Sequence, residues 1–247
     1  MKKELLLLKR EFEKIKSLGY IKSSRKGFTG IGKTFEDLIG KEEDKLEMPD
    51  YHGIEIKTKR GYSKSYVHLF HATPKGKNDF EIKRLCKTYG YPDKIKKEYK
   101  VLAFSIQGNK SVFVANRFLF KLSIDYENKK IYLIICDKNM QLVEQDIYWD
   151  FDLIQEKLER KLSYLAFIKA WSKTIKGIDY YNYYAIQFYE LKSFSVFLYL
   201  MEQGVIRITF NIGVFRDGPR MGEIHDRGTS FEIEEQNIQK LFNQLNI

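Results

Sequence analysis

The sequence predicts a mixed α+β fold, because segments with helical periodicity and segments with strand periodicity follow one another along the whole chain. Apolar residues recur every three or four positions near the amino terminus, whereas several central segments alternate apolar with polar residues. With 247 residues and only four prolines, the chain is long enough to bury a large core and shows no flexible linker. We therefore expect one large domain or two closely packed lobes.

The amino-terminal part is expected to form two helices and two strands. Apolar residues at helical spacing predict an amphipathic helix over 3–18. Thr34 is expected to cap a short helix that reaches Ile39 and carries Glu36 in its first turn. We then expect a solvated acidic loop over 41–47 and strands over 53–59 and 65–70.

The rest of the chain is expected to be richer in strands than in helices. We predict a helix over 79–89, strands over 101–106, 111–124 and 130–136, a helix over 151–160, strands over 162–172 and 180–189, a helix over 193–203, strands over 205–215 and 229–233, and a terminal helix. The last two strands form a hairpin with a polar, glycine-containing connection. The aromatic residues of 180–189 are interpreted as packing residues rather than as a base-stacking platform.

The charge balance favours a polyanionic partner. Lys and Arg number 43 against 33 Asp and Glu, which gives a formal net charge of +10. A membrane surface would also attract this charge, but no apolar run is long enough to span a bilayer. Cys86 and Cys136 are the only cysteines, which argues against a disulfide scaffold and against structural zinc. We expect a soluble, cytoplasmic protein.

One short segment carries the residues of a metal-dependent phosphodiesterase. Glu55 and Lys57 lie two residues apart on a predicted strand, so their side chains should point to the same side while Ile54 and Ile56 enter the core. A tight turn at 52–53 would return Asp50 beside Glu55. Two carboxylates held in this way are ligands that Mg²⁺ prefers. Charged residues at these spacings also occur by chance, so the motif alone does not decide the function.

A second motif suggests a different function. Residues 27–34 satisfy the spacing G-x-x-x-x-G-K-T of a loop that binds nucleotide phosphates. Such a loop follows a buried strand, but the preceding residues 20–26 are polar and basic. A glycine-rich basic turn of this kind also suits contact with a DNA phosphate, with Lys33 beside it.

Two blocks of sequence, taken together, resemble a known family. The first runs from Arg25-Lys26-Gly27 through 29–38 and continues with Pro49-Asp50 and 53–58, and the second covers 212–229. Both are similar to segments of the MvaI/BcnI restriction endonucleases, which are relatives of the mismatch-repair nicking enzyme MutH. The resemblance implies a PD-(D/E)XK core of mixed sheet flanked by helices, Mg²⁺ dependence, and a two-lobed clamp around duplex DNA.

The resemblance also implies roles for individual residues. Asp50 and Glu55 would bind the metal together with the backbone carbonyl of Ile56, and Lys57 would orient the attacking water. Glu36 matches a helix carboxylate that lies near the metals, although an acidic residue early in a helix also has a structural explanation.

DNA contacts are expected at both ends of the chain. Arginine pairs with guanine in the major groove and carboxylates accept from cytosine, so the polar connection of the last hairpin is suited to base reading. The expected DNA-binding residues are Arg25, Lys26, Lys33, Asn211, Phe215, Arg216, Asp217, Arg220, His225, Asp226 and Arg227. Asn211 and Glu232 stand where one member of the family is expected to have arginines, so the target sequence is expected to differ from that member's.

The resemblance therefore implies a type II endonuclease that cuts duplex DNA at a short GC-containing site. The catalytic lobe would be centred on 1–90 and the recognition lobe would include 205–233. The resemblance also implies a monomer that nicks the strands in turn, with a DNA methyltransferase as the expected genetic partner. Three alternatives stay open: a MutH-like nickase that needs a partner protein, a DNA-binding module without catalysis, and a nucleotidase built on residues 27–34.

Overall fold

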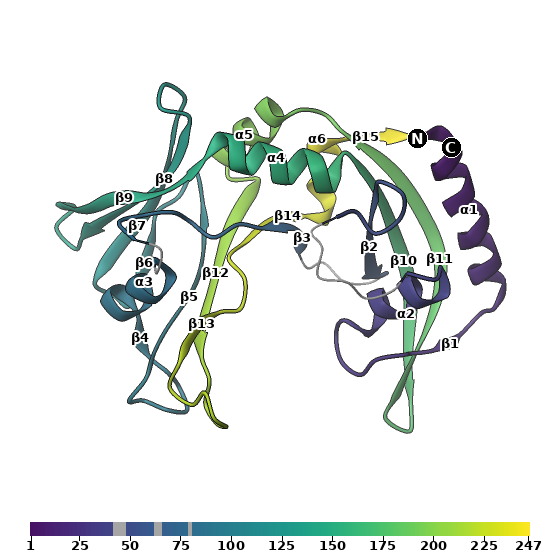
Figure 1. Cartoon of the computed structure of the whole chain (residues 1–247), viewed down its shortest axis with the longest axis horizontal. Coiled ribbons are helices and arrows are strands. Elements are labelled where there is room, and N and C mark those ends of the chain that lie inside the picture. Colours follow the sequence, from purple (N-terminus) through teal and green to yellow (C-terminus); the bar gives the residue numbers. More distant parts are fainter. Residues whose placement is uncertain (42–47, 62–65, 79–80) are drawn as a thin grey trace. The chain divides into compact units, whose positions relative to one another are not determined.

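A computed structural model describes residues 1–41, 48–61, 66–78 and 81–247 (Figure 1). Most of the predicted acidic loop, and the start of the helix predicted from residue 79, lie outside these residues. The chain divides into two compact units. The first unit comprises Met1–Ser65, Lys157–Ser193 and Ile238–Ile247, and the second comprises Tyr66–Glu156 and Phe194–Asn237. The first unit thus gathers three stretches of sequence rather than residues 1–90 alone.

A five-stranded sheet forms the centre of the first unit. Its strands are β1 (Ile21–Lys22), β11 (Ile178–Leu191), β10 (Tyr164–Ile175) and β2 (Ile54–Arg60), in that order, with β15 (Phe242–Leu245) also paired to β11. The pairing of β10 with β2 is parallel and the other pairings are antiparallel. Within the described residues β2 pairs with β10 alone, so its other edge is open to the residues that precede it.

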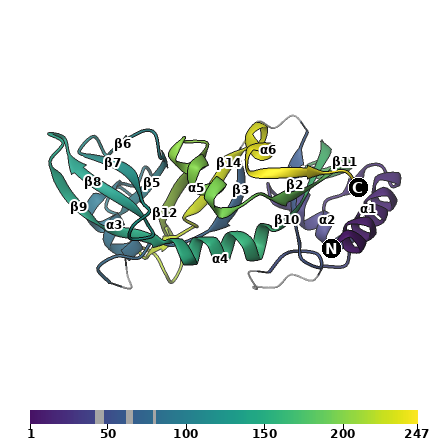
Figure 2. The ribbon, with the colours of Figure 1, turned by 90° about the horizontal axis from the view of Figure 1, so that it is seen from above.

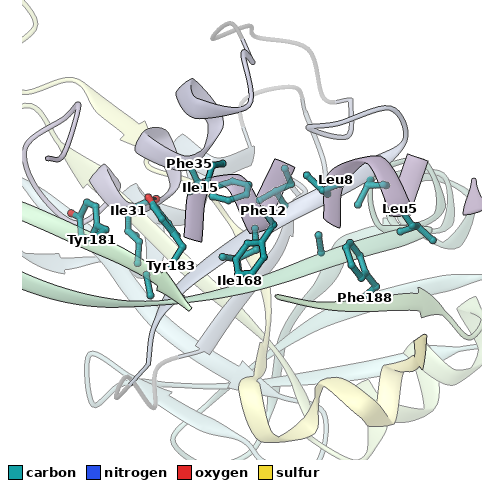
Figure 3. Close-up of a cluster of buried hydrophobic side chains, with 14 residues drawn as sticks. Leu5, Leu8, Phe12, Ile15, Ile31, Phe35, Ile168, Tyr181, Tyr183 and Phe188 are labelled. Carbon is teal, nitrogen blue, oxygen red and sulfur yellow. Dashed lines mark hydrogen bonds between the residues drawn. The ribbon is translucent and has the colours of Figure 1, made fainter. Parts of the chain in front are cut away.

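Two helices pack against this sheet and form its core. The buried side chains of α1 (Lys2–Ser17) and α2 (Gly30–Leu38) point toward those of the strands in Figure 3. The cluster consists of Leu5, Leu8, Phe12, Ile15, Ile31, Phe35, Ile54, Ile56, Ala166, Ile168, Ala170, Tyr181, Tyr183 and Phe188. The prediction that Ile54 and Ile56 enter the core is confirmed, and so is the packing role of Tyr181 and Tyr183. Alternation along β2 therefore turns Glu55 and Lys57 to the other side.

The start of α2 differs from the prediction. The helix begins at Gly30, so Thr34 is a buried residue inside it and does not cap it. The hydroxyl of Thr34 instead accepts the N–H of Ser24 at 3.0 Å. Gly30 permits the early start, because a Cβ there would lie only 2.5 Å from the carbonyl oxygen of Arg25. Glu36 is accordingly near the end of the helix, and an interaction with the positive end of the helix dipole is ruled out.

The second unit contains two sheets. One follows the order β3 (Tyr66–His71), β14 (Ser230–Glu234), β12 (Ile206–Val214), β5 (Lys100–Gln107) and β4 (Tyr91–Pro92), with β13 (Ile224–Asp226) paired to β12. The other is the antiparallel sheet β6 (Val112–Val114), β7 (Phe118–Asp125), β8 (Lys130–Asp137) and β9 (Leu142–Asp150), visible in Figure 2. The helices are α3 (Glu81–Tyr89), α4 (Phe151–Leu162), which continues into the first unit, and α5 (Phe194–Glu202).

Three details of the second unit were not predicted. The strand expected over 111–124 is two strands, because Ala115 and Asn116 adopt positive φ and make a tight turn. β9 was not predicted, because its first half does not alternate: the apolar Leu142 and Val143 are exposed, whereas the polar Glu144 is buried. β13 lies within the connection that was expected to be a loop.

The carboxyl-terminal segment has a short helix, as predicted, followed by a strand that was not. A 3-10 turn at Glu235–Asn237 leads into α6 (Ile238–Leu241), and β15 then returns to the sheet of the first unit. Among the described residues, no helix has the length and apolar character needed to cross a membrane.

Candidate active site

A two-residue turn brings Asp50 to the open edge of β2. His52 and Gly53 have φ values of 45° and 86°, and Tyr51 and Ile54 exchange backbone hydrogen bonds of 2.9 and 2.8 Å. The predicted turn at 52–53 is thus confirmed. The N–H of Ile56 donates to Oδ2 of Asp50 at 2.9 Å. Asp50 therefore accepts the hydrogen bond of a backbone N–H at the edge of β2, where no neighbouring strand is described.

Glu55 and Lys57 form an ion pair on the face of β2 that is opposite to Ile54 and Ile56. Nζ of Lys57 lies 2.6 Å from Oε1 of Glu55, whose side chain is only 2 % exposed. A second amine, Nζ of Lys161, lies 3.6 Å from the same oxygen. Lys161 comes from α4, which leads directly into β10, and β10 lies beside β2 in parallel register.

The carboxylates of the site influence one another. Burial raises the pKa of Glu55, and the nearby charge of Asp50 raises it further, against the opposing effect of Lys57. Burial likewise raises the pKa of Glu36, again with a contribution from Asp50. Asp50 thus lies within electrostatic reach of Glu55 and Glu36. Burial and this repulsion disfavour the ionisation of all three carboxyl groups at the same time.

Lysines offset part of this repulsion. Lys41 donates its backbone N–H to the carbonyl of Glu36 at 2.9 Å, and its Nζ lies 2.7 Å from Oδ1 of Asp50. Sequence reasoning did not identify Lys41 or Lys161 as members of the site. Lys41 begins the acidic segment that is predicted to be a solvated loop, and Lys161 is more than a hundred positions from Lys57 along the chain.

The donor set fits a hard divalent cation. Oε2 of Glu55 is buried, and no described residue donates a hydrogen bond to it, which is costly for a carboxylate oxygen. The carbonyl of Ile56 points to the same edge as its N–H and hence toward Asp50. In the described residues no three His, Cys, Asp or Glu side chains group as metal ligands. A cation here would therefore take oxygens from two carboxylates, the backbone and water, as Mg²⁺ does.

Residues 27–34 do not form a nucleotide-binding loop. The strand before them, β1, is two residues long and pairs antiparallel with β11 at the edge of the sheet. Lys33 lies inside α2, where its Nζ is 2.7 Å from Oδ1 of Asp37. The buried parallel strand and the free lysine that would bind triphosphate are both missing from this described region. The nucleotidase hypothesis is therefore wrong.

Ion pairs and hydrogen bonds hold the polar connection of the last hairpin, one of them to Asp93 in the loop before β5. Arg216 donates two hydrogen bonds to Asp93, and Nε of Arg220 donates to Glu223 at 2.8 Å. The carboxylate of Asp226 accepts from the N–H groups of Gly228 and Thr229 and from the hydroxyl of Thr229. The structure thus assigns local structural contacts to three of the residues expected to bind DNA.

Several expected base-reading residues, Arg220 among them, also contact one another on or near β12 and β13. The ring of Phe215 stacks on His225 at a centroid distance of 4.1 Å, and the Arg220 guanidinium lies 4.2 Å from the Phe215 ring. Nε of Arg227 lies 3.4 Å from Nε2 of His225. Asp217, Arg227 and Asn211 are exposed. The structure therefore gathers Phe215, Arg220, His225 and Arg227 into one cluster.

The comparisons with known proteins agree with this architecture. The chain matches the model of the MvaI/BcnI restriction endonuclease family over residues 9–242. It is similar to the solved complex of restriction endonuclease MvaI with cognate DNA substrate, with 33% sequence identity and a TM-score of 0.89 over 99% of this chain and 98% of that chain. MvaI in the absence of DNA matches with the same identity and coverage and a TM-score of 0.64. No match exists among the curated proteins searched. With its mixed α+β fold and a family match over nearly its whole length, the chain belongs to the MvaI/BcnI restriction endonuclease family.

Proposed function

We propose that this protein is a Mg²⁺-dependent type II restriction endonuclease with a PD-(D/E)XK active site of the MutH-like kind. Family membership implies a DNA nuclease, and the metal dependence and the active-site class are our extension of it. The observation that carries the proposal is the meeting of Asp50, Glu55 and Lys57 at β2, with one buried Glu55 oxygen lacking a donor among the described residues.

Each residue of the site has a distinct chemical task in this proposal. Asp50, Glu55 and the carbonyl of Ile56 would hold Mg²⁺, which supplies positive charge against the charge that develops on the phosphate. Lys57 would orient the attacking water and lower the energy of the transition state electrostatically. Glu36, within electrostatic reach of Asp50, would act beside the metal site.

We assign phosphodiester cleavage to the first unit and base reading to the second. The cluster of Phe215, Arg220, His225 and Arg227 offers guanidinium groups of the kind that pair with guanine, which favours a short GC-containing site. Asn211, Asp217 and Asp226 complete the proposed reading set, whereas Glu232 forms an ion pair with Arg207 at 2.7 Å and is less free to contact bases. On the phosphate side, Arg25, Lys26 and Lys33 are the proposed contacts.

The mode of action is also a proposal. We infer that a monomer encloses the duplex as a two-lobed clamp and nicks one strand at a time, and that a DNA methyltransferase protects the host sequence. No membrane partner is proposed. A nickase that depends on a partner protein would share the active site but would cut poorly alone.

The test is digestion of plasmid and phage DNA with purified protein, followed by sequencing of the ends. We expect discrete ends with Mg²⁺, no cutting with EDTA, and no cutting by Asp50→Ala, which should still shift the mobility of duplex DNA. Intact DNA under all conditions, from a protein that still binds it, would support the binding-module or partner-dependent alternatives. Cutting by Asp50→Ala at the wild-type rate would place the chemistry at another site.

A further inference from the structure

A cavity of about 470 Å³ lies on the first unit, and its lining includes none of the residues assigned to cleavage. Its lining residues come from the loop that precedes α2 and from the turn that joins β10 to β11. Its lining consists of Lys22, Ser23, Ser24, Arg25, Lys26, Gly27, Gly177, Ile178 and Asp179. The lining carries three cations and one carboxylate, and Oδ1 of that carboxylate already accepts the Thr174 hydroxyl at 2.6 Å. The cavity is therefore suited to an anion.

Short contacts fix the backbone that carries these cations. The N–H of Ser23 donates to the carbonyl of Asp179 at 2.8 Å, which joins the loop to the turn. The Ser23 hydroxyl donates to the carbonyl of Arg25 at 2.6 Å, and Ser24 donates to Thr34 of α2. The loop is thus tied to both neighbouring elements before any ligand arrives, which lowers the entropy cost of binding.

The amines around the cavity are exposed and available. In the described part of the chain, neither Lys22 nor Lys26 forms an ion pair, and both side chains are exposed. Lys22 and Lys173 are both paired with Tyr180, from β1 and β10 respectively, so the three side chains lie in a row on one face of the sheet. Lys176 adjoins Gly177 in the turn. The positive surface therefore extends beyond the cavity itself.

An aromatic side chain completes the surface. Phe28, the residue after the cavity loop, is 89 % exposed, and the Arg60 guanidinium lies 5.9 Å from its ring. The guanidinium of Arg60 thus adds a further positive charge at the rim of the surface. A pocket that binds a single free phosphate group does not require positive charge over a surface of this extent.

We propose that this cavity binds the sugar-phosphate backbone of duplex DNA, with Lys22 and Lys26 each neutralising a phosphate. The inference rests on the proposed DNA substrate and on the phosphate contacts already proposed for Arg25 and Lys26, and it deepens them by adding Lys22 and the turn after β10. Free nucleotides offer the same phosphate chemistry, but the extended positive charge favours a polymer.

The experiment measures the salt dependence of binding to a duplex without a cleavage site, in EDTA, by fluorescence anisotropy. Each phosphate contact contributes about 0.9 to the slope of log K against log salt. The variant Lys22→Ala/Lys26→Ala should therefore lose roughly 1 to 2 from the slope, and about tenfold or more in affinity near 0.1 M salt. Base preference of cleavage should stay as in wild type.

The matched control is Lys2→Ala/Lys3→Ala, which removes the same charge from the exposed first turn of α1. We expect it to keep the wild-type slope. Equal slopes for the two double variants would overturn the proposal, and so would tripolyphosphate binding that depends on Lys22 and Lys26 while the duplex slope is unchanged. Binding is measured without metal, so the salt slopes can be interpreted even if the protein does not cleave DNA. The proposed phosphate contacts and the proposed nuclease activity can therefore fail separately.

Discussion

Arg216 donates two hydrogen bonds to Asp93, from Nε to Oδ1 over 3.0 Å and from Nη2 to Oδ2 over 2.7 Å. The carboxylate also accepts the N–H groups of Ile95 and Lys96, so one side chain joins the loop before β5 to the polar connection after β12. The hydrogen bond from Arg216 holds the pKa of Asp93 well below its usual range. In this structure, Arg216 therefore positions the connection, whereas the sequence had suggested that it reads bases.

Replacing Arg216 should destabilise the second unit. Arg216→Ala leaves the buried Asp93 carboxylate without its guanidinium partner, which is costly. The stability from a depressed carboxyl pKa is present above the unfolded pKa and lost as pH falls through the folded pKa. We expect a lower urea midpoint at pH 7, with a smaller difference from wild type in acid.

Arg220→Ala is the matched control, because Arg220 pairs with an exposed glutamate on the same connection. It should keep the wild-type midpoint. If Arg216→Ala keeps its midpoint and changes only the preferred DNA sequence, then Arg216 is a base-reading residue and the structural interpretation is wrong.

Glu55→Gln should stabilise the metal-free protein near neutral pH. A carboxyl group whose pKa is raised in the folded state binds its proton more tightly there, so the free energy of unfolding falls as pH rises from the unfolded pKa through the folded one. The amide cannot ionise and avoids this loss. Thermal unfolding in EDTA should give a higher melting temperature for Glu55→Gln at pH 7 and a smaller difference at pH 4.

The same variant should lose cleavage and should no longer be stabilised by Mg²⁺. In glutamine an NH₂ group replaces one metal-binding carboxylate oxygen, and the negative charge is lost. Wild-type protein should melt at a higher temperature when Mg²⁺ is added at pH 7. Equal stabilisation of both proteins by Mg²⁺ would remove Glu55 from the metal site.

Gly30 should be less replaceable than Gly32. A Cβ at Gly30 would lie 2.5 Å from the Arg25 carbonyl oxygen, whereas one at Gly32 would come no nearer than 3.3 Å to the Thr58 hydroxyl. Gly30→Ala should therefore cost about 1–3 kcal/mol of unfolding free energy through overpacking. Gly32→Ala should be close to neutral, because the contact is offset by the better helix propensity of alanine.

Chemical denaturation of both variants checks this. A nucleotide-binding loop would show the reverse order, since Gly32 and not Gly30 belongs to that motif. A Gly32→Ala protein less stable than Gly30→Ala would contradict the packing at the start of α2.

Local patterns predicted the parts of the site that lie close together in sequence. The alternation of 54–57 fixed which side chains enter the core, and the turn at 52–53 required φ values that Gly53 adopts readily. The start of α2 was placed wrongly because a threonine before an apolar run resembles a cap, while the close approach of Gly30 to Arg25 is a tertiary contact.

The remaining parts depend on pairings between distant segments. Lys161 reaches Glu55 only because β10 lies parallel to β2, with Leu165 opposite Glu55. Arg216 and Asp93 are 123 positions apart, and no periodicity in either segment marks the other. Nothing local to the sequence distinguishes a base-reading arginine from one that already has a carboxylate partner.

The central claim is that the carboxylates at β2 and Lys57 cut DNA, and the most direct measurement compares Lys57→Met with Lys59→Met. Both lysines lie on β2 and point to the same side, and Lys59 is two residues farther from Glu55. Single-turnover cleavage in Mg²⁺ should fall by at least about a hundredfold in Lys57→Met, as expected for losing an electrostatic contact to the transition state. Binding in EDTA should be nearly unchanged, and a folded Lys59→Met should cut at close to the wild-type rate. Equal cleavage by the two variants would contradict the assignment of Lys57 and with it the proposed active site.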